Sequence, residues 1–166
     1  MKRVPILVVY LSFALLSSAA QAQASYDRIA EYEKVKAVID RFGRMWEDED
    51  MEAFANVVAQ DADILIIGTD SAEVWQGYDA YRKARERQYE SFENVEFNVY
   101  DQQIRMSEDG TVAWFVESFD LVTIAQGNPV ILEGIRLTGV LEKRRGYWRI
   151  VQLHNSVPIL GQAAEY

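Results

Sequence analysis

The spacing of apolar residues divides the chain into a helical first half and a strand-rich second half. Between residues 27 and 46, apolar side chains recur at steps of three and four, which predicts one amphipathic helix. Asp50 is placed to cap a short second helix over residues 51–58. A compact apolar run at 62–67 predicts a short strand, and residues 77–92 predict a third helix. The inner face of that third helix is expected to carry Tyr81, Ala84, Gln88 and Phe92.

The second half contains turn signals that separate long apolar segments. The segments are residues 95–106, 111–124, 130–143 and 147–157, and the turns are Asp109-Gly110, Gly127-Asn128-Pro129 and Arg145-Gly146. Strands normally have about five or six residues, so strands this long must twist and usually contain bulges. The apolar alternation slips near Gln102-Gln103, which predicts a bulge there. We expect an α+β fold, with three N-terminal helices packed on the concave face of a long, strongly curled antiparallel sheet.

The first 24 residues have the order of a secretory signal peptide. Lys2 and Arg3 precede an apolar run at 4–16, and small residues with two overlapping Ala-x-Ala sites follow. This run is shorter than the roughly 20 residues of a membrane-spanning helix, which argues against an anchor. We predict cleavage after Ala22 or Ala24, and a single domain over residues 25–166 that is periplasmic or secreted.

Cysteine is absent and histidine occurs once, which narrows the available chemistry. Without cysteine there is no disulfide, no thiolate nucleophile, no cysteine-based zinc site and no lipid-modified cysteine behind the signal peptide. The acidic run at 47–50 lacks the glycine and the spacing of a calcium loop. We therefore expect no metal ion and no other cofactor.

The net charge is strongly negative and argues against nucleic-acid binding. The whole chain has 17 Lys+Arg and 26 Asp+Glu, a net charge of −9, and removing the predicted signal peptide takes away Lys2 and Arg3, which gives −11. A chain this acidic repels phosphate backbones and anionic lipid. The expected partner is a small molecule, with no nucleic acid and no membrane insertion after cleavage.

The most specific sequence motifs are three segments near the end of the chain: residues 134–138 (GIRLT), 143–150 (KRRGYWRI) and 154–158 (HNSVP). Together they resemble the SnoaL-like families of the nuclear-transport-factor-2-like superfamily, and the ending is also similar to the association domain of calcium/calmodulin-dependent kinase II. The resemblance implies a cone-shaped roll, commonly a homodimer through the sheet, with a pocket between helices and sheet. It implies no single activity, because such folds host isomerases, cyclases, dehydratases, assembly domains and binding proteins.

Arg136 and His154 are the first candidates for the polar floor of that pocket. A three-residue hairpin loop ending at Gly146 would place Arg136 directly opposite His154 on one face of the sheet. A two-residue loop would change the register by one and place them on opposite faces. We favour the longer loop because of Gly146, with Lys143 opposite Tyr147.

An Arg–His pair on the concave face suits a carboxylate or another anion, and Ser156 would extend the same polar floor. The alternative for Arg136 is an ion pair with Glu117 or Glu133, and the alternative for His154 is a purely structural role. The expected apolar walls are Trp114, Trp46 and Tyr81, although each of these also suits an ordinary core.

Glu117 lies among apolar neighbours on a predicted strand, so it needs a partner or a raised pKa. Together with His154 it is a conceivable acid/base pair for a small lyase or isomerase without a metal. Other carboxylates available as a base are Asp63, Asp70 and Asp120.

Three functions follow from these patterns. The first is an exported binding domain that holds a small, partly apolar, anionic ligand against Arg136 and His154. The second is a lyase or isomerase of the ketosteroid isomerase type that uses His154 or Glu117 as acid or base. The third is a dimerisation module without a ligand.

Overall fold

The computed structural model describes the backbone of residues 6–159 and 161, and side chains from Asp27 onward. In this part of the chain the helices are α1 (Ile6–Asp48), α2 (Met51–Val57) and α3 (Tyr78–Ser91). The strands are β1 (Leu65–Ile67), β2 (Val74–Gln76), β3 (Phe92–Met106), β4 (Val112–Ala125), β5 (Asn128–Arg144) and β6 (Tyr147–Ser156). The predicted signal peptide, residues 1–24, lies outside the described side chains. Within the described residues, no helix combines the length and hydrophobicity needed to cross a membrane.

The strands form one curled sheet in the order β2-β1-β6-β5-β4-β3. Strands β3 to β6 pair antiparallel in sequence order, which confirms the predicted meander. The short strand β1 adds to the edge of β6 in parallel, and β2 pairs antiparallel with β1. The sequence patterns did not predict β2, because three residues are too few to show an alternation. The fold is therefore α+β with a mixed sheet at one edge.

A bulge in β3 changes which side chains face the helices. The pairing of β3 with β4 shifts between Tyr100 and Gln103, as the sequence predicted, and Asp101 has a positive φ of 53°. Before the bulge, Phe97 is buried; after it, Gln102 and Ile104 occupy the inward positions. The bulge thus turns a polar side chain, that of Gln102, toward α1.

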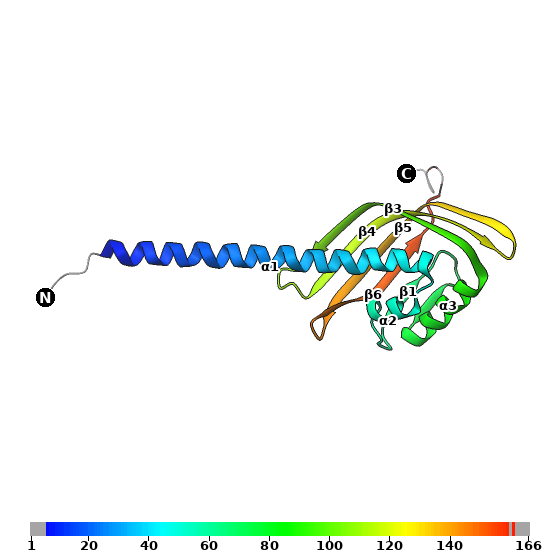
Figure 1. Ribbon diagram of the computed structural model, residues 1–166, viewed down its shortest axis with the longest axis horizontal. Coiled ribbons are helices and arrows are strands. Elements are labelled where there is room, and N and C mark those ends of the chain that lie inside the picture. Colours follow the sequence, from blue (N-terminus) through cyan, green and yellow to red (C-terminus); the bar gives the residue numbers. More distant parts are fainter. Residues whose placement is uncertain (1–5, 160, 162–166) are drawn as a thin grey trace.

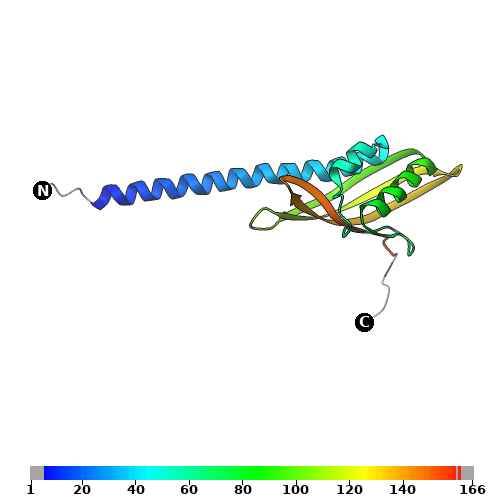
Figure 2. The ribbon, with the colours of Figure 1, turned by 90° about the horizontal axis from the view of Figure 1, so that it is seen from below.

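Helix α1 lies across one face of the sheet, with α2 and α3 beside it (Figures 1 and 2). Its inner side chains are buried, and they follow the predicted spacing: Val35, Ile39, Phe42 and Met45. The side chain of Asp50 accepts a hydrogen bond from the Ala53 amide at 2.8 Å, which confirms the predicted cap of α2. The core therefore lies between these helices and the concave face of the sheet.

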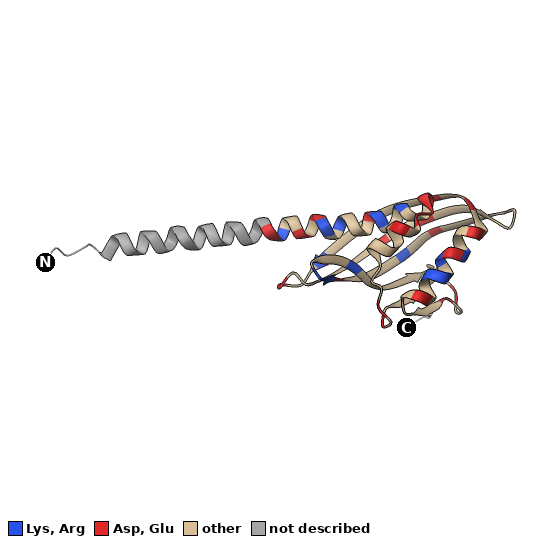
Figure 3. Cartoon of the chain, turned by 60° about the horizontal axis from the view of Figure 1, so that its bottom comes forward, with Lys and Arg blue, Asp and Glu red and all other residues tan. Residues whose placement is uncertain are grey.

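Acidic and basic residues are interspersed along α3 and the described part of α1 (Figure 3). Glu31 makes three charged or polar contacts. It accepts a hydrogen bond from the indole of Trp148 at 2.8 Å, and it forms ion pairs with Lys143 at 2.8 Å and Lys34 at 2.8 Å. These contacts, chiefly the one with Lys143, lower the pKa of Glu31 to about 2. The cluster attaches α1 to the hairpin of β5 and β6.

The hairpin between β5 and β6 corrects the predicted register. Arg144 pairs with Tyr147, so the loop has two residues, and the predicted pair of Lys143 with Tyr147 is wrong. Both loop residues have positive φ, 52° at Arg145 and 86° at Gly146, as a type I′ turn requires. The prediction failed because Arg145 adopts a backbone conformation that residues other than glycine seldom adopt.

Candidate functional site

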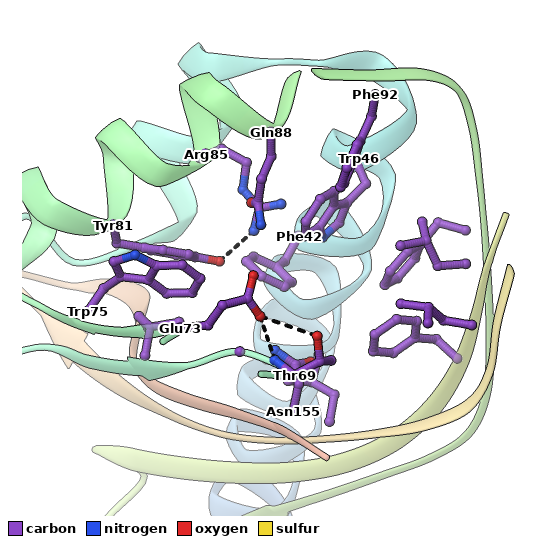
Figure 4. Close-up of a pocket in the computed structure, with 17 residues that line it drawn as sticks. Phe42, Trp46, Thr69, Glu73, Trp75, Tyr81, Arg85, Gln88, Phe92 and Asn155 are labelled. Carbon is purple, nitrogen blue, oxygen red and sulfur yellow. Dashed lines mark hydrogen bonds between the residues drawn. The ribbon is translucent and has the colours of Figure 1, made fainter. Parts of the chain in front are cut away.

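A cavity of about 100 Å³ lies between α1, α3 and the concave face of the sheet (Figure 4). Aromatic side chains form the largest part of its apolar wall: Phe42, Trp46, Trp75, Tyr81, Phe92, Phe97 and Phe119. Four aliphatic side chains complete that wall: Ile66, Leu121, Leu132 and Leu137. The polar side chains that reach it are those of Thr69, Glu73, Arg85, Gln88 and Asn155. Few polar groups inside an apolar enclosure are typical of a small-molecule site.

Arg85 is the most unusual residue of this cavity. Its side chain is fully buried, at 1% exposed, yet none of the ion pairs among the described residues includes it. Its Nη2 donates to the hydroxyl of Tyr81 at 2.5 Å, whereas Nε and Nη1 have no hydrogen-bond partner. The guanidinium stacks on Trp46, 3.4 Å from the ring centroid. A buried cation without a counter-charge is costly, so an anion in the cavity would stabilise it.

Local sequence on α3 explains why Tyr81 and Arg85 act together. They are four residues apart, so they lie on one face of the helix, and both are buried. The ring of Tyr81 packs against Phe54 and Trp75, with centroids 5.2 and 5.7 Å apart. Burial raises the pKa of Tyr81 despite the nearby Arg85, so the phenol keeps its proton at neutral pH. Because its oxygen accepts from Arg85, its own O–H stays available to a ligand.

Glu73 faces the same cavity from the connection between β1 and β2 (Figure 4). Its Oε2 accepts hydrogen bonds from the backbone and hydroxyl of Thr69, at 2.6 and 3.2 Å, and from the Asp70 amide at 3.3 Å. The other oxygen points toward the space below Tyr81 and Arg85 (Figure 4). Gly68 makes room for this arrangement, because a Cβ at that position would overlap Glu73. The cavity thus presents a carboxylate and a guanidinium on different walls.

Glu117 lies on the concave face of the sheet, but it does not line the aromatic cavity. Its carboxylate is 1% exposed and accepts a hydrogen bond from Gln102 Nε2 at 2.8 Å, while its Oε1 has no partner. Burial raises the pKa of Glu117 to about 7, against the opposing effect of the Gln102 hydrogen bond. The sequence predicted either a partner or a raised pKa for Glu117, and the structure shows both.

The predicted pair of Arg136 and His154 lies on the wrong face for this cavity. Arg136 pairs across the sheet with Ser156, and His154 pairs with Thr138. Arg136 and His154 share a face, because a second register shift near Val140 offsets the change made by the shorter turn. That face is the outer one, since both side chains are exposed while their strand neighbours point into the core.

Trp114 is also on the outer face and is 47% exposed. Of the predicted pocket residues, the structure therefore brings Trp46 and Tyr81 into the cavity and leaves Trp114, Arg136, His154 and Ser156 outside it. Any ligand contact of these four residues would lie on the outer face of the sheet, and it stays a prediction. Glu117 and His154 lie on opposite faces of the sheet, so the predicted acid/base pair does not form.

Sequence reasoning missed Arg85 and Glu73. The signal for Arg85 was present, because it follows Tyr81 by four residues and Ala84 by one, within the predicted inner face of the third helix. Nothing in the local pattern identified Glu73, which reaches the cavity through the unpredicted hairpin of β1 and β2. Among the described residues, no group of three or more acidic or histidine side chains is arranged to hold a metal ion.

Comparison with known proteins gives a family match and a consistent fold. A family model described as "SnoaL-like domain" matches residues 35–160. A nuclear transport factor 2-like superfamily protein from Salmonella enterica is 15% identical, with a TM-score of 0.69 over 84% of this chain and 99% of that one. A hexachlorocyclohexane dehydrochlorinase, LinA type 2, is 11% identical, with a TM-score of 0.71 over 81% and 90% of the two chains.

A protein from Novosphingobium aromaticivorans, assigned provisionally as a scytalone dehydratase, is 14% identical, with a TM-score of 0.69 over 81% and 89% of the two chains. At these identities the likeness shows the fold alone. Among curated proteins, none matches this chain.

Proposed function

This chain belongs to the SnoaL-like domain family, and from that premise we propose that it binds a small organic anion with a flat apolar body in the aromatic cavity. The observation that carries the proposal is the buried guanidinium of Arg85, whose Nε and Nη1 have no partner in the described residues. This replaces Arg136 and His154 as the anion-binding group. The expected ligand is still partly apolar and anionic.

The cavity has partners for both the anionic group and the apolar body of such a ligand. The anionic group would accept hydrogen bonds from Arg85 and from the O–H of Tyr81, in a site where low polarity strengthens charged hydrogen bonds. The apolar body would lie against rings such as Phe97 and Phe119, whose centroids are 4.4 Å apart. A cavity of about 100 Å³ has space for roughly one ring of the ligand.

Calorimetric titration with benzoate as the probe tests the proposal. We expect benzoate to bind the wild-type chain and the isosteric neutral benzamide to bind at least about tenfold more weakly, which corresponds to about 1.4 kcal/mol. Arg85→Met should lose benzoate binding. Arg82→Met is the matched control, because Arg82 lies on the same helix and its side chain is 53% exposed. Equal affinities in the two variants would contradict the proposal.

A second candidate function is an isomerase or lyase reaction in the same cavity, and the position of Glu73 favours it. Glu73 would remove a proton from a carbon next to a carbonyl group, and Tyr81 and Arg85 would stabilise the resulting enolate oxygen. Return of the proton to a different carbon would complete an isomerisation. Glu73 takes the role first expected of His154 or Glu117, neither of which lines the cavity.

Proton exchange in D₂O distinguishes the enzyme from the binding protein. A β,γ-unsaturated cyclic ketone is the probe, and NMR would follow deuterium incorporation and the shift of the double bond. Glu73→Gln should abolish the exchange while benzoate binding persists. Glu93→Gln, an exposed residue of β3, is the control. Absence of exchange in the wild-type chain would leave the binding function and exclude this reaction for the probe.

Export and self-association complete the proposal. Residues 1–24 support export, and N-terminal sequencing of protein recovered from the periplasm or the medium would test cleavage after Ala22 or Ala24.

The exposed apolar side chains of Trp114 and Val116 on the outer face support a homodimer through the sheet.

A further inference from the structure

A second cavity, of about 200 Å³, lies between α1 and the bulged part of β3 and β4. Phe97 lines both this cavity and the aromatic one, so the two are neighbours. The backbone of Gly43 on α1 and the side chains of Ile39 and Val99 form its apolar part. None of the functions proposed above uses this space, which we call the acidic chamber.

Hydrogen-bond acceptors dominate the polar lining of the acidic chamber. The buried Glu117 has an oxygen, Oε1, without any partner. The side-chain NH₂ of Gln102 donates to Glu117 Oε2 at 2.8 Å and to Asp40 Oδ1 at 3.2 Å. Its carbonyl oxygen remains available as an acceptor. Glu47 adds a further carboxylate, and one of its oxygens is held by the Phe97 amide at 3.0 Å.

Two side chains bring positive charge to the acidic chamber among the described residues that line it or pair with its lining. Arg44 lines it, and Lys36 reaches Asp40 from outside at 2.6 Å. Lining carboxylates thus outnumber lining cations. The wall offers more acceptors than donors and more negative than positive charge, so a complementary occupant carries positive charge and several N–H donors.

We propose that the acidic chamber is a binding site for a small primary ammonium group, which donates to Glu117 Oε1, to Asp40 and to the carbonyl of Gln102. The negative charge of Asp40, Glu47 and the ionised form of Glu117 disfavours a carboxylate or phosphate in this chamber. A short alkyl substituent on the ammonium group would contact Ile39 and Val99. The site is independent of Arg85, so it does not rest on the function proposed for the aromatic cavity.

Ligand binding and ionisation of Glu117 are linked. An ammonium group beside the carboxylate favours its charged form, so binding lowers the pKa of Glu117 from its raised value of about 7. By reciprocity, the affinity for the ammonium group rises as the pH increases through that value. Asp40, Glu47, Arg44 and Lys36 are the other charged groups facing this site.

Carboxyl-carbon NMR of the full chain tests the proposal, with ethylammonium as the probe. We expect saturable shifts at Glu117 and Gln102, a lower Glu117 pKa with the probe than without it, and binding at least about tenfold weaker in Glu117→Gln. Glu108→Gln, in the exposed turn after β3, should bind as the wild-type chain does.

A second variant tests the location of the probe without removing the carboxylate. An added Cβ at Gly43 would lie 3.5 Å from Phe97 and 3.6 Å from Val99, in ordinary contact, so Gly43→Ala should fold and narrow the chamber. It should weaken ethylammonium binding and leave benzoate binding unchanged. An unchanged pKa of Glu117 up to the highest ethylammonium concentration, or equal shifts at Gln102 in wild type and Glu117→Gln, would show that the probe does not bind beside Glu117 and would overturn the proposal.

Discussion

The guanidinium carbon of Arg85 lies 3.4 Å from the centroid of the Trp46 ring, and this aromatic face stands where a buried arginine usually has a carboxylate. A desolvated cation over an indole is stabilised by about 2 kcal/mol, which offsets only part of the cost of burying the charge. The contact with Trp46 lets the cavity hold the cation without a counter-charge. The part of the burial cost that it leaves uncompensated favours the binding of an anionic ligand. Trp46 also packs against Phe97, with ring centroids 6.1 Å apart, so the stack connects Arg85 to the sheet.

A double-mutant cycle on Arg85 and Trp46 should measure this coupling. Trp46→Leu removes both the cation–π contact and aromatic packing, so we expect the free energy of unfolding to fall by about 3 kcal/mol. In the Arg85→Met background the same change should cost about 1–2 kcal/mol less, because no cation is left to lose its support. Urea denaturation of the four chains gives the coupling energy. Strict additivity would show that the two side chains do not stabilise each other.

Glu117 should make the stability of the chain fall with rising pH across the neutral range. Its folded pKa of about 7 lies above the unfolded value of 4.5, so its contribution is fully present below pH 4.5 and is lost as the pH rises through 7. The shift corresponds to about 3 kcal/mol. Glu117→Gln keeps an oxygen that accepts from Gln102, and it should be more stable than wild type at pH 8 but not at pH 4.

Unfolding by urea at several pH values checks this prediction, with Glu108→Gln as an exposed control. If wild type and Glu117→Gln have parallel pH profiles, the carboxylate is not held in a desolvated site.

The sequence predicted the architecture well, because long periodic segments carry their own signal. The spacing of Ile39, Phe42 and Met45 on the first helix, and the slip of alternation near Gln102, are local features, and both were read correctly. The site depended on information that is not local. Arg145 adopts a left-handed backbone conformation, and this changes the register of the β5–β6 hairpin from the predicted one. A second shift near Val140 changes the register again.

The hairpin register bears only on whether Arg136 and His154 share a face, and the burial of their strand neighbours Ile135, Leu137 and Leu153 decides that this face is the outer one. The group that does reach the cavity, Arg85, was not among the side chains predicted for the inner face of the third helix. Its burial is visible only once α1 and the sheet are in place around α3.

Glu31 should contribute stability at neutral pH that disappears in acid, the opposite direction to Glu117. Its folded pKa of about 2 is below the unfolded value of 4.5, so its contribution is present above pH 4.5 and is lost as the pH falls toward 2. Its side chain is 18% exposed and its partner Lys34 lies in solvent, so screening reduces the effect to about 1 kcal/mol. Glu31→Gln should lose this amount at pH 7 and nothing near pH 2.

Glu33→Gln, an exposed neighbour on the same helix, is the control for Glu31. Equal unfolding free energies for wild type and Glu31→Gln at pH 7 would show that the contacts with Lys143 and Trp148 add nothing.

Trp114 should decide whether two copies associate through the outer face of the sheet. It lies between Arg105 on β3 and Val140 on β5, so a large apolar ring stands exposed on this face, near the beginning of β4. Trp114→Lys would bring two further cations together beside Arg105 at a self-complementary interface, and like charges there repel. Sedimentation should show a dimer for the wild-type chain and a monomer for Trp114→Lys. Tyr147→Lys, at the exposed first residue of β6, should remain dimeric, and a wild-type chain that is monomeric at all concentrations would contradict the interface.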